Sequence, residues 1–251
     1  DNTAATAAAL QSRQVDGAYE GNVEQFDLFK AMDHVDIYAK TTASTAVART
    51  RLDQEQFKDA RVRKAMRLAV DVPKTVEIAV GEQGSAAEHH HVSPVHPDYK
   101  QLPEMTRNVE EAKKLLADAG YPDANIRCKI NVLPSAKFWD VWDKVPFGFT
   151  NWVHRPLGFM VLGLAYRSGV PWNESAYSNP EFDQILTQAE GTLDIEARRE
   201  LIGKLEQIMQ EDGPIIQPIW LKIYMPMDKK VKGFDLHPTR YFFCEDYAVE
   251  A

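Results

Sequence analysis

Apolar residues recur every three or four positions in several stretches of the chain, which is the spacing of one helix face. These stretches are residues 3–13, 23–32, 59–71, 108–120, 179–191 and 194–214. The last four begin with a side chain that can accept a backbone N–H bond, namely Asp59, Asn108, Asn179 and Asp194. The pattern therefore predicts helices in all of these stretches, with a defined first residue for the last four.

Charged and aromatic residues predict how some of these segments face the interior. In residues 59–71, Lys64 and Arg67 fall opposite the apolar side of a 3.6-residue repeat, so both are expected to point to water. Trp139 and Trp142 have the spacing of an amphipathic helix and are expected to pack inward.

Other stretches predict extended chain. Residues 36–53, DIYAKTTASTAVARTRLD, are rich in threonine and are predicted to form two strands. Residues 214–227 and 231–243 alternate on either side of a turn at Asp228–Lys230, and a short strand is expected around residues 15–19. Helices and strands intermix along the chain, so the predicted class is α/β or α+β.

Composition adds broad limits. A chain of 251 residues can form one large or two modest domains. Its 44% apolar and 26% charged residues are typical of a globular protein. The formal net charge of −8 argues against nucleic acid and anionic membrane surfaces as main partners.

Cysteine chemistry is not expected to contribute. Cys128 and Cys244 are far apart in sequence, and neither lies in a CxxC motif. They are predicted to be buried, unpaired thiols, and neither a zinc or redox centre nor another cofactor is predicted.

A long irregular segment, residues 81–103, contains the run EHHHVSPVHPDY and is either functional or disordered. His89, His90, His91 and His96 are enough imidazoles to coordinate a transition metal. No Cys or HExxH pattern accompanies them, so no metal site is predicted. A solvent-facing loop, or histidines at the edge of a cleft, is the favoured interpretation.

An enzyme is the alternative. Glu88 with His89, or Asp98 with His96, can be drawn as an acid and base pair. No GxSxG, P-loop or GxGxxG motif is present, and Ser93 has no nucleophile-elbow context. Enzymatic activity is therefore not predicted, and a hydrolase or metal-binding protein that uses His89–His96 remains the second hypothesis.

Five segments carry a family resemblance in a fixed order. They are DARVRKAMRLAVD, NVEEAKKLLADAGYP, WNESAYSNPEFDQILTQAE, DIEARRELIGKLEQIMQEDGPIIQPIW and VKGFDLHPT. Together they resemble the extracellular solute-binding proteins of family 5, the oligopeptide- and dipeptide-binding group that serves ABC importers.

The resemblance implies a two-lobed α/β fold of the periplasmic-binding-protein type II class. Family members are roughly twice as long, so the N-terminal part of the first lobe is expected to be missing here. Residues 1–80 would hold the remnant of that lobe and the crossover, and residues 81–171 the second lobe. Residues 172–251 would add second-lobe helices and return to the first lobe. An internal stretch near residues 130–131 is also expected to be absent.

The resemblance also implies a function. Such proteins trap a peptide-like or other small solute between their lobes, deliver it to a membrane permease and break no bond. The expected partners are the ligand, the ABC permease and the missing N-terminal half. The expected location is the periplasm, or the outer face of the membrane.

Candidate ligand contacts follow from NWVHRP, residues 151–156. Peptide-binding members place a Trp there, closely followed by an aspartate that pairs with the peptide's amino group. Here Trp152 keeps the aromatic ring, but His154 and Arg155 replace the acid. An anionic ligand group is therefore expected, because a guanidinium repels ammonium and binds carboxylate. The alternative is that Arg155 pairs with Glu174 as a structural brace.

Other candidate contacts lie elsewhere. Trp172, Asn173 and Glu174 fall on a segment that borders the site in the family, although Asn173 could equally serve as a turn residue. His90 and His91 are the candidate contacts from the histidine segment.

Overall fold

The computed structural model describes residues 3–19, 21, 25–125, 127 and 129–250. The helices are α1 (Thr3–Gln11), α2 (Phe26–Lys30), α3 (Ala60–Ala69), α4 (Val72–Ala79), α5 (Val109–Asp118), α6 (Ser135–Trp139), α7 (Gly158–Ala165), α8 (Pro180–Gly191) and α9 (Ile195–Asp212). The strands are β1 (Val35–Thr50), β2 (Gly84–Ala86), β3 (Phe147–Trp152), β4 (Ile215–Asp228), β5 (Val231–Lys232) and β6 (Ala248–Val249). Helices and strands intermix, as an α/β fold requires.

Two long antiparallel strands, β1 and β4, run through the molecule and pair from Val35 opposite Asp228 to Arg49 opposite Ile215. The main sheet of the described residues has the order β2-β4-β1-β3. Residues 36–53 were predicted to form two strands. That prediction is wrong, because one strand of 16 residues covers most of them and bends at irregularities instead of breaking.

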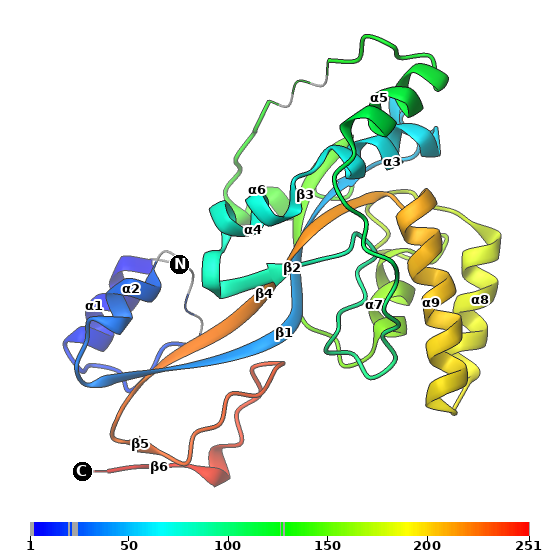
Figure 1. The fold of residues 1–251 in the computed structure, drawn as a ribbon. Coiled ribbons are helices and arrows are strands. Elements are labelled where there is room, and N and C mark those ends of the chain that lie inside the picture. The colour runs from blue at the N-terminus through cyan, green and yellow to red at the C-terminus, as the bar shows by residue number, and fades with distance from the viewer. Residues whose placement is uncertain (1–2, 20, 22–24, 126, 128, 251) are drawn as a thin grey trace.

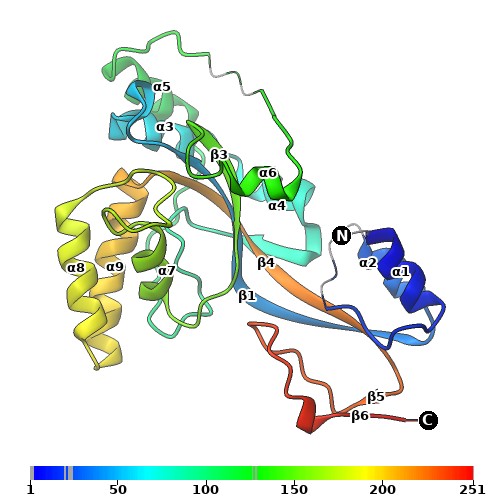
Figure 2. The ribbon, with the colours of Figure 1, turned by 180° about the vertical axis from the view of Figure 1, so that it is seen from behind.

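Helices and other segments pack against both ends of the β1–β4 ribbon (Figure 1). At one end lie α1, α2 and the small β5–β6 sheet, whose apolar clusters include Leu10, Phe29 and Phe234. The other end carries most of the helices, and Figure 2 shows the same division from behind. Its main core packs α7, α8 and α9 together through residues such as Leu186 and Leu205.

Helix starts agree with the sequence. Asp59 accepts the Arg61 N–H at 2.8 Å, and Asn108 accepts the Glu111 N–H at 3.0 Å. Asn179 and Asp194 cap α8 and α9 in the same way. The four capping predictions are confirmed, since each depends only on residues within one turn.

Arg67 contradicts the expectation that it points to water, because its side chain is buried. The guanidinium donates to the carbonyl oxygens of Gln210 at 3.0 Å and Gly213 at 2.6 Å. It therefore supplies donors to carbonyls at the end of α9 that have no intrahelical partner. Burial lowers the pKa of Arg67 to about 9, so the guanidinium still holds its charge at neutral pH.

Two further side-chain predictions are wrong. Trp139 does not pack inward: it is 55% exposed and stacks edge-on against Trp142 at 5.7 Å. Cys244 is exposed rather than buried. Cys128 lies outside the described residues.

The segments 1–80, 81–171 and 172–251 remain a prediction. Within the described residues, α3 packs on α5 and α9, and α4 packs on β4. The first segment thus contributes helices to the same body as the later ones. No described helix has the length and apolar character needed to cross a membrane.

Candidate ligand-binding site

The end of β3 rests on a buried carboxylate. Glu174 accepts a bond from Arg49 Nε at 3.0 Å, from Thr150 Oγ1 at 2.6 Å and from Trp152 Nε1 at 3.1 Å. All four residues are buried. The predicted brace between Arg155 and Glu174 is therefore wrong, because Arg49 is the cation that pairs with Glu174.

Arg49 also ties β1 to the turn before β3. Its remaining guanidinium nitrogens donate to the carbonyl oxygens of Val145, at 2.5 Å, and Trp142. Burial lowers the pKa of Arg49, and the hydrogen bond and charge of Glu174 oppose that change. The two residues form a buried ion pair that fixes β3 in place.

The two tryptophans have different positions. Trp152 is only 6% exposed, whereas Trp172 is 46% exposed, and their rings meet edge to face at 6.0 Å. Trp172 thus presents an aromatic surface, which Trp152 supports from beneath. Asn173 donates to the carbonyls of Arg167 and Tyr177 and accepts the Tyr177 N–H, so it orders the turn.

His154 is held by β1. The Ala43 N–H donates to His154 Nδ1 at 3.0 Å, and the His154 N–H donates to Ser44 Oγ at 3.1 Å. Because a backbone N–H can only donate, Nδ1 must be the unprotonated nitrogen of the neutral ring. The proton of the half-buried His154 ring is therefore on Nε2.

Arg155 is half-buried, and among the described residues it forms no ion pair with a carboxylate. Its Nη1 donates to the His154 carbonyl at 3.2 Å, and its own carbonyl contacts His96 Nε2 at 3.0 Å. Arg155 borders a surface hollow of about 330 Å³ with Phe159 and Met160 of α7. Arg167 and Glu190, which pair with each other at 2.7 Å, line the same hollow, so it carries both signs of charge.

The histidine segment is packed in the interior. His89, His90 and His91 are buried, so the prediction of a solvent-facing loop is wrong. His89 Nδ1 accepts the Gln217 N–H at 2.9 Å, and His91 Nδ1 lies 2.6 Å from Tyr166 Oη. Burial lowers the pKa of His89 and of His91 to about 3, so both rings are neutral at pH 7.

The two acid and base pairs considered from the sequence, Glu88 with His89 and Asp98 with His96, form no hydrogen bond or ion pair with each other in the described structure. Glu88 accepts from Tyr99 Oη at 3.0 Å and lies 3.5 Å from His90 Nε2 rather than against His89. Asp98 accepts the Gly158 N–H at 3.0 Å, at the start of α7. Within the described part of the chain, no group of three His, Cys, Asp or Glu residues is arranged to hold a metal ion.

His237 was missed by the sequence reasoning. Burial lowers the pKa of His154, and its neighbours His237 and Arg155 lower it further. His237 lies on the segment after β5, which packs beside the other half of the β1–β4 ribbon (Figure 1). A single histidine more than 80 positions away carries no spacing signal.

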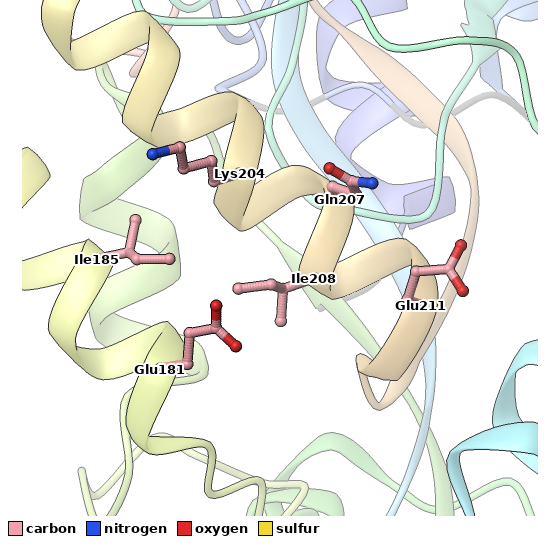
Figure 3. Close-up of a pocket in the computed structure, with 6 residues that line it drawn as sticks. All are labelled: Glu181, Ile185, Lys204, Gln207, Ile208 and Glu211. Atoms are coloured by element: carbon pink, nitrogen blue, oxygen red, sulfur yellow. The ribbon is translucent and has the colours of Figure 1, made fainter.

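Another hollow lies on the outer helix pair, with a volume of about 320 Å³. Figure 3 shows Glu181 and Ile185 of α8 facing Lys204, Gln207, Ile208 and Glu211 of α9. Its floor is apolar and its rim carries both signs of charge. The described strands do not line it, so it is separate from the site after β3.

In this structure a ribbon of two long strands joins two packed bodies, and aromatic and cationic residues lie at the end of a neighbouring strand. This is the architecture of a two-lobed solute-binding protein. The family model of the bacterial extracellular solute-binding proteins, family 5 (middle part), matches residues 1–140, which is more than half of the chain. The chain belongs to this family.

The names of related proteins refer to different ligands. Dipeptide-binding protein DppE of Bacillus subtilis is 25% identical over 277 residues, covering 92% of this chain and 50% of DppE. Heme-binding protein A of Haemophilus influenzae is 22% identical over 273 residues, covering 93% of this chain and 50% of that protein. The chain therefore spans about half the length of these curated relatives.

Solved structures show the same fold. The oligopeptide-binding protein AppA of Bacillus subtilis, in complex with a nonapeptide, superposes with a TM-score of 0.85 at 18% identity. The match covers 100% of this chain and 59% of AppA. The α/β fold of periplasmic binding proteins is thus confirmed.

Proposed function

We propose that this chain is part of the substrate-binding component of an ABC importer, which captures a peptide-like or other small solute and passes it to the permease. Family membership and the shared fold support this proposal. The ligands in the names of relatives range from dipeptide to heme, so the solute has to be inferred from this chain's own residues.

The observation that carries the proposal is the continuous β1–β4 pair. It links one body around α1, α2 and β5–β6 to another around α7–α9. The register shifts between Thr41 and Ser44, between the two bodies. Such a ribbon allows two bodies to close on a solute while they stay connected.

The proposed ligand surface lies after β3. Trp172 offers an exposed ring that packs against Trp152, and His154 and Arg155 follow Trp152 in the chain and offer hydrogen-bond donors. His90, His91, Trp152 and Glu174 support this surface from the interior rather than bordering solvent. The proposed solute therefore carries an electron-rich or anionic group beside an apolar part.

The proposed setting follows from the family: a periplasmic or extracellular protein that works with an ABC permease in the membrane. The rest of the first lobe would come from the same protein, beyond this chain. No bond of the solute would be broken, because capture and release require only closing and opening.

Native mass spectrometry of the natural protein, purified from its source, tests the proposal. The expected result is a complex heavier by one small solute, which denaturation releases chemically unchanged. The released solute is then added back to the protein for one hour and analysed again. Recovery of a cleaved product would indicate a hydrolase and contradict the proposal.

A further inference from the structure

A further hollow, with a volume of about 470 Å³, lies between residues 129–133, α6 and β3. Most of the residues that line it are apolar: Ile130, Leu133, Phe138, Val141, Trp142, Val145, Phe147 and Phe149. We propose that this hollow binds a small amphipathic anion, whose aromatic or branched aliphatic body fills the hollow and whose carboxylate pairs with Lys129 at its rim. The site is separate from the surface proposed for the transported solute and adds a second binding activity to the chain.

The size and lining of the hollow suit a small molecule. Ligand pockets usually have volumes of about 300–1,000 Å³ and are lined mainly by apolar and aromatic side chains, with few polar groups. The hollow beside β3 meets both conditions. Its walls come from three parts of the chain, namely residues 129–133, α6 with the turn that follows it, and the start of β3. Figures 1 and 2 both show α6 beside β3.

One wall of the hollow is fixed by β1. Arg49 Nη1 donates to the Val145 carbonyl at 2.5 Å, and Arg49 Nη2 donates to the Trp142 carbonyl. Gly148 leaves room for this guanidinium, since a Cβ at Gly148 would lie 2.9 Å from Arg49 Nη2. The wall from Trp142 to Gly148 is therefore held against β1 before any ligand arrives. A wall that is already ordered lowers the entropic cost of binding.

Apolar side chains at the hollow are exposed to water. Thr150 and Trp152 are buried on the face of β3 that meets Glu174. Phe149 lies on the opposite face, because side chains alternate along a strand, and it is 60% exposed. Ile130, which lines the same hollow, is 85% exposed. Exposed apolar surface gathered around a hollow marks a binding site, because an apolar ligand removes it from water.

The charge at the hollow favours an anion. Lys129 is the one ionisable side chain among the described residues that line the hollow, and no carboxylate lines it. Within the part of the chain that the structure describes, Lys129 forms no ion pair. A ligand carboxylate would therefore gain a charge-assisted partner without displacing a protein group. Asn131 adds an amide, which can donate to the same carboxylate.

Calorimetric titration of the 251-residue chain with 4-phenylbutyrate tests the site. Two ligand controls separate its features: 4-phenylbutylamine has the same apolar body with a positive charge, and butyrate has the same carboxylate without the ring. The expected result is saturable binding of 4-phenylbutyrate at one site. The amine should bind at least about threefold more weakly, because it is repelled by Lys129. Butyrate should bind at least about tenfold more weakly, because it buries no ring.

Variants with matched controls locate the binding. Val141→Trp fills the hollow and should abolish binding of 4-phenylbutyrate, whereas Leu193→Trp, at a position that is 93% exposed between α8 and α9, should leave it unchanged. Lys129→Glu should weaken binding of 4-phenylbutyrate about fivefold and strengthen binding of the amine. Lys137→Glu is the charge control, because Lys137 is exposed on α6 and does not line the hollow. Urea midpoints equal to the parent's establish that each variant is folded.

The site is overturned if 4-phenylbutyrate does not bind, if the amine binds as tightly, or if Lys129→Glu and folded Val141→Trp bind 4-phenylbutyrate as the parent does. Sedimentation velocity examines another occupant, a second copy of the chain. Dimers that Val141→Trp dissociates and that 4-phenylbutyrate leaves intact would assign the hollow to self-association and also overturn the ligand site. None of these outcomes bears on the proposed function, which depends on the solute released from the natural protein.

Discussion

Replacing Glu174 with alanine should expose how much the buried ion pair stabilises the strand that leads to the site. The side chain of Arg49 is fully buried and that of Glu174 is 4% exposed. The substitution removes the only carboxylate that pairs with Arg49 in the described chain and also leaves Thr150 Oγ1 and Trp152 Nε1 without their acceptor.

The magnitude follows from these partners. Removing one member of a buried pair costs about 3–5 kcal/mol, because the other charge stays desolvated. Arg49 keeps the carbonyls of Val145 and Trp142 as acceptors, which places the expected cost for Glu174→Ala near the lower end, about 3 kcal/mol. Urea unfolding followed by tryptophan fluorescence measures this free energy, with an unchanged slope against urea concentration.

A surface pair supplies the matched control. Arg167 and Glu190 are 2.7 Å apart but partly exposed, so Glu190→Ala should cost about 0–1 kcal/mol. The double variant Arg49→Met/Glu174→Leu should lose less stability than Glu174→Ala, since no unpaired charge stays buried. The reasoning is refuted if Glu174→Ala and Glu190→Ala lower the unfolding free energy equally.

Three further predictions concern other buried groups and the ligand surface. Arg67→Met should lower the unfolding free energy by about 1–3 kcal/mol in urea unfolding, because carbonyls at the end of α9 lose their donor; no change would contradict this role. The pKa values of His89 and His91, lowered to about 3, lie below that of a free histidine, so the unfolded chain takes up protons that the native state does not. Stability should therefore fall as pH drops below about 6.5, by about 2 kcal/mol per ring at pH 5. Glu206 has the opposite effect: burial raises its pKa to about 8, so its protonation stabilises the native state as pH falls from about 8 towards 4.5. The Glu206→Gln variant removes this opposing contribution, so urea unfolding of that variant at a series of pH values measures the loss from the histidines. A free energy of unfolding that does not change with pH would contradict the prediction. Trp172→Ala should weaken binding of the solute released from the natural protein by about 1–3 kcal/mol in calorimetry without changing the urea midpoint, and unchanged affinity would remove Trp172 from the site.

Local signals in the sequence carried most of the secondary structure. The caps at Asp59, Asn108, Asn179 and Asp194 were predictable, because each accepts an N–H within three residues of itself. The boundaries of α5, α8 and α9 follow from them within a few residues. The order of motifs led correctly to the family and its fold.

Burial of polar groups was not predictable in the same way. His89 is fixed by Gln217, and His91 by Tyr166, so their partners lie 128 and 75 positions away in the chain. Arg67 reaches residues more than 140 positions later. A periodic pattern indicates which face of a helix is charged. It does not distinguish an exposed arginine from a buried one, because carbonyl acceptors can stabilise the buried guanidinium.

Contacts between residues that are distant in the sequence also limited the prediction of the candidate site. That NWVHRP contacts the ligand stays a prediction. Its Trp152 donates to Glu174, whose cationic partner is Arg49, on a strand 125 positions away. Trp152 was expected to face the ligand, yet it supports the more exposed Trp172. Sequence proximity could group these residues, whereas the division between buried and exposed side chains required the fold.

The irregularity between Thr41 and Ser44 connects the long strand to this site. In a regular ladder every second N–H of β1 would bond to β4. Here Thr42 Oγ1 donates to the Leu221 carbonyl at 2.9 Å and accepts the Ser44 N–H at 3.0 Å, so a side chain replaces main-chain pairing. The Ala43 N–H is thereby directed to His154 Nδ1.

That single bond decides the chemistry of His154. With Nδ1 occupied, the neutral ring has its proton on Nε2 and offers a donor. A straightened β1 would return the Ala43 amide to the ladder and release Nδ1, and the ring could then present an acceptor. The bulge therefore has two effects: it interrupts the regular pairing of the strand between the two bodies, and it selects the tautomer of His154 that donates from Nε2.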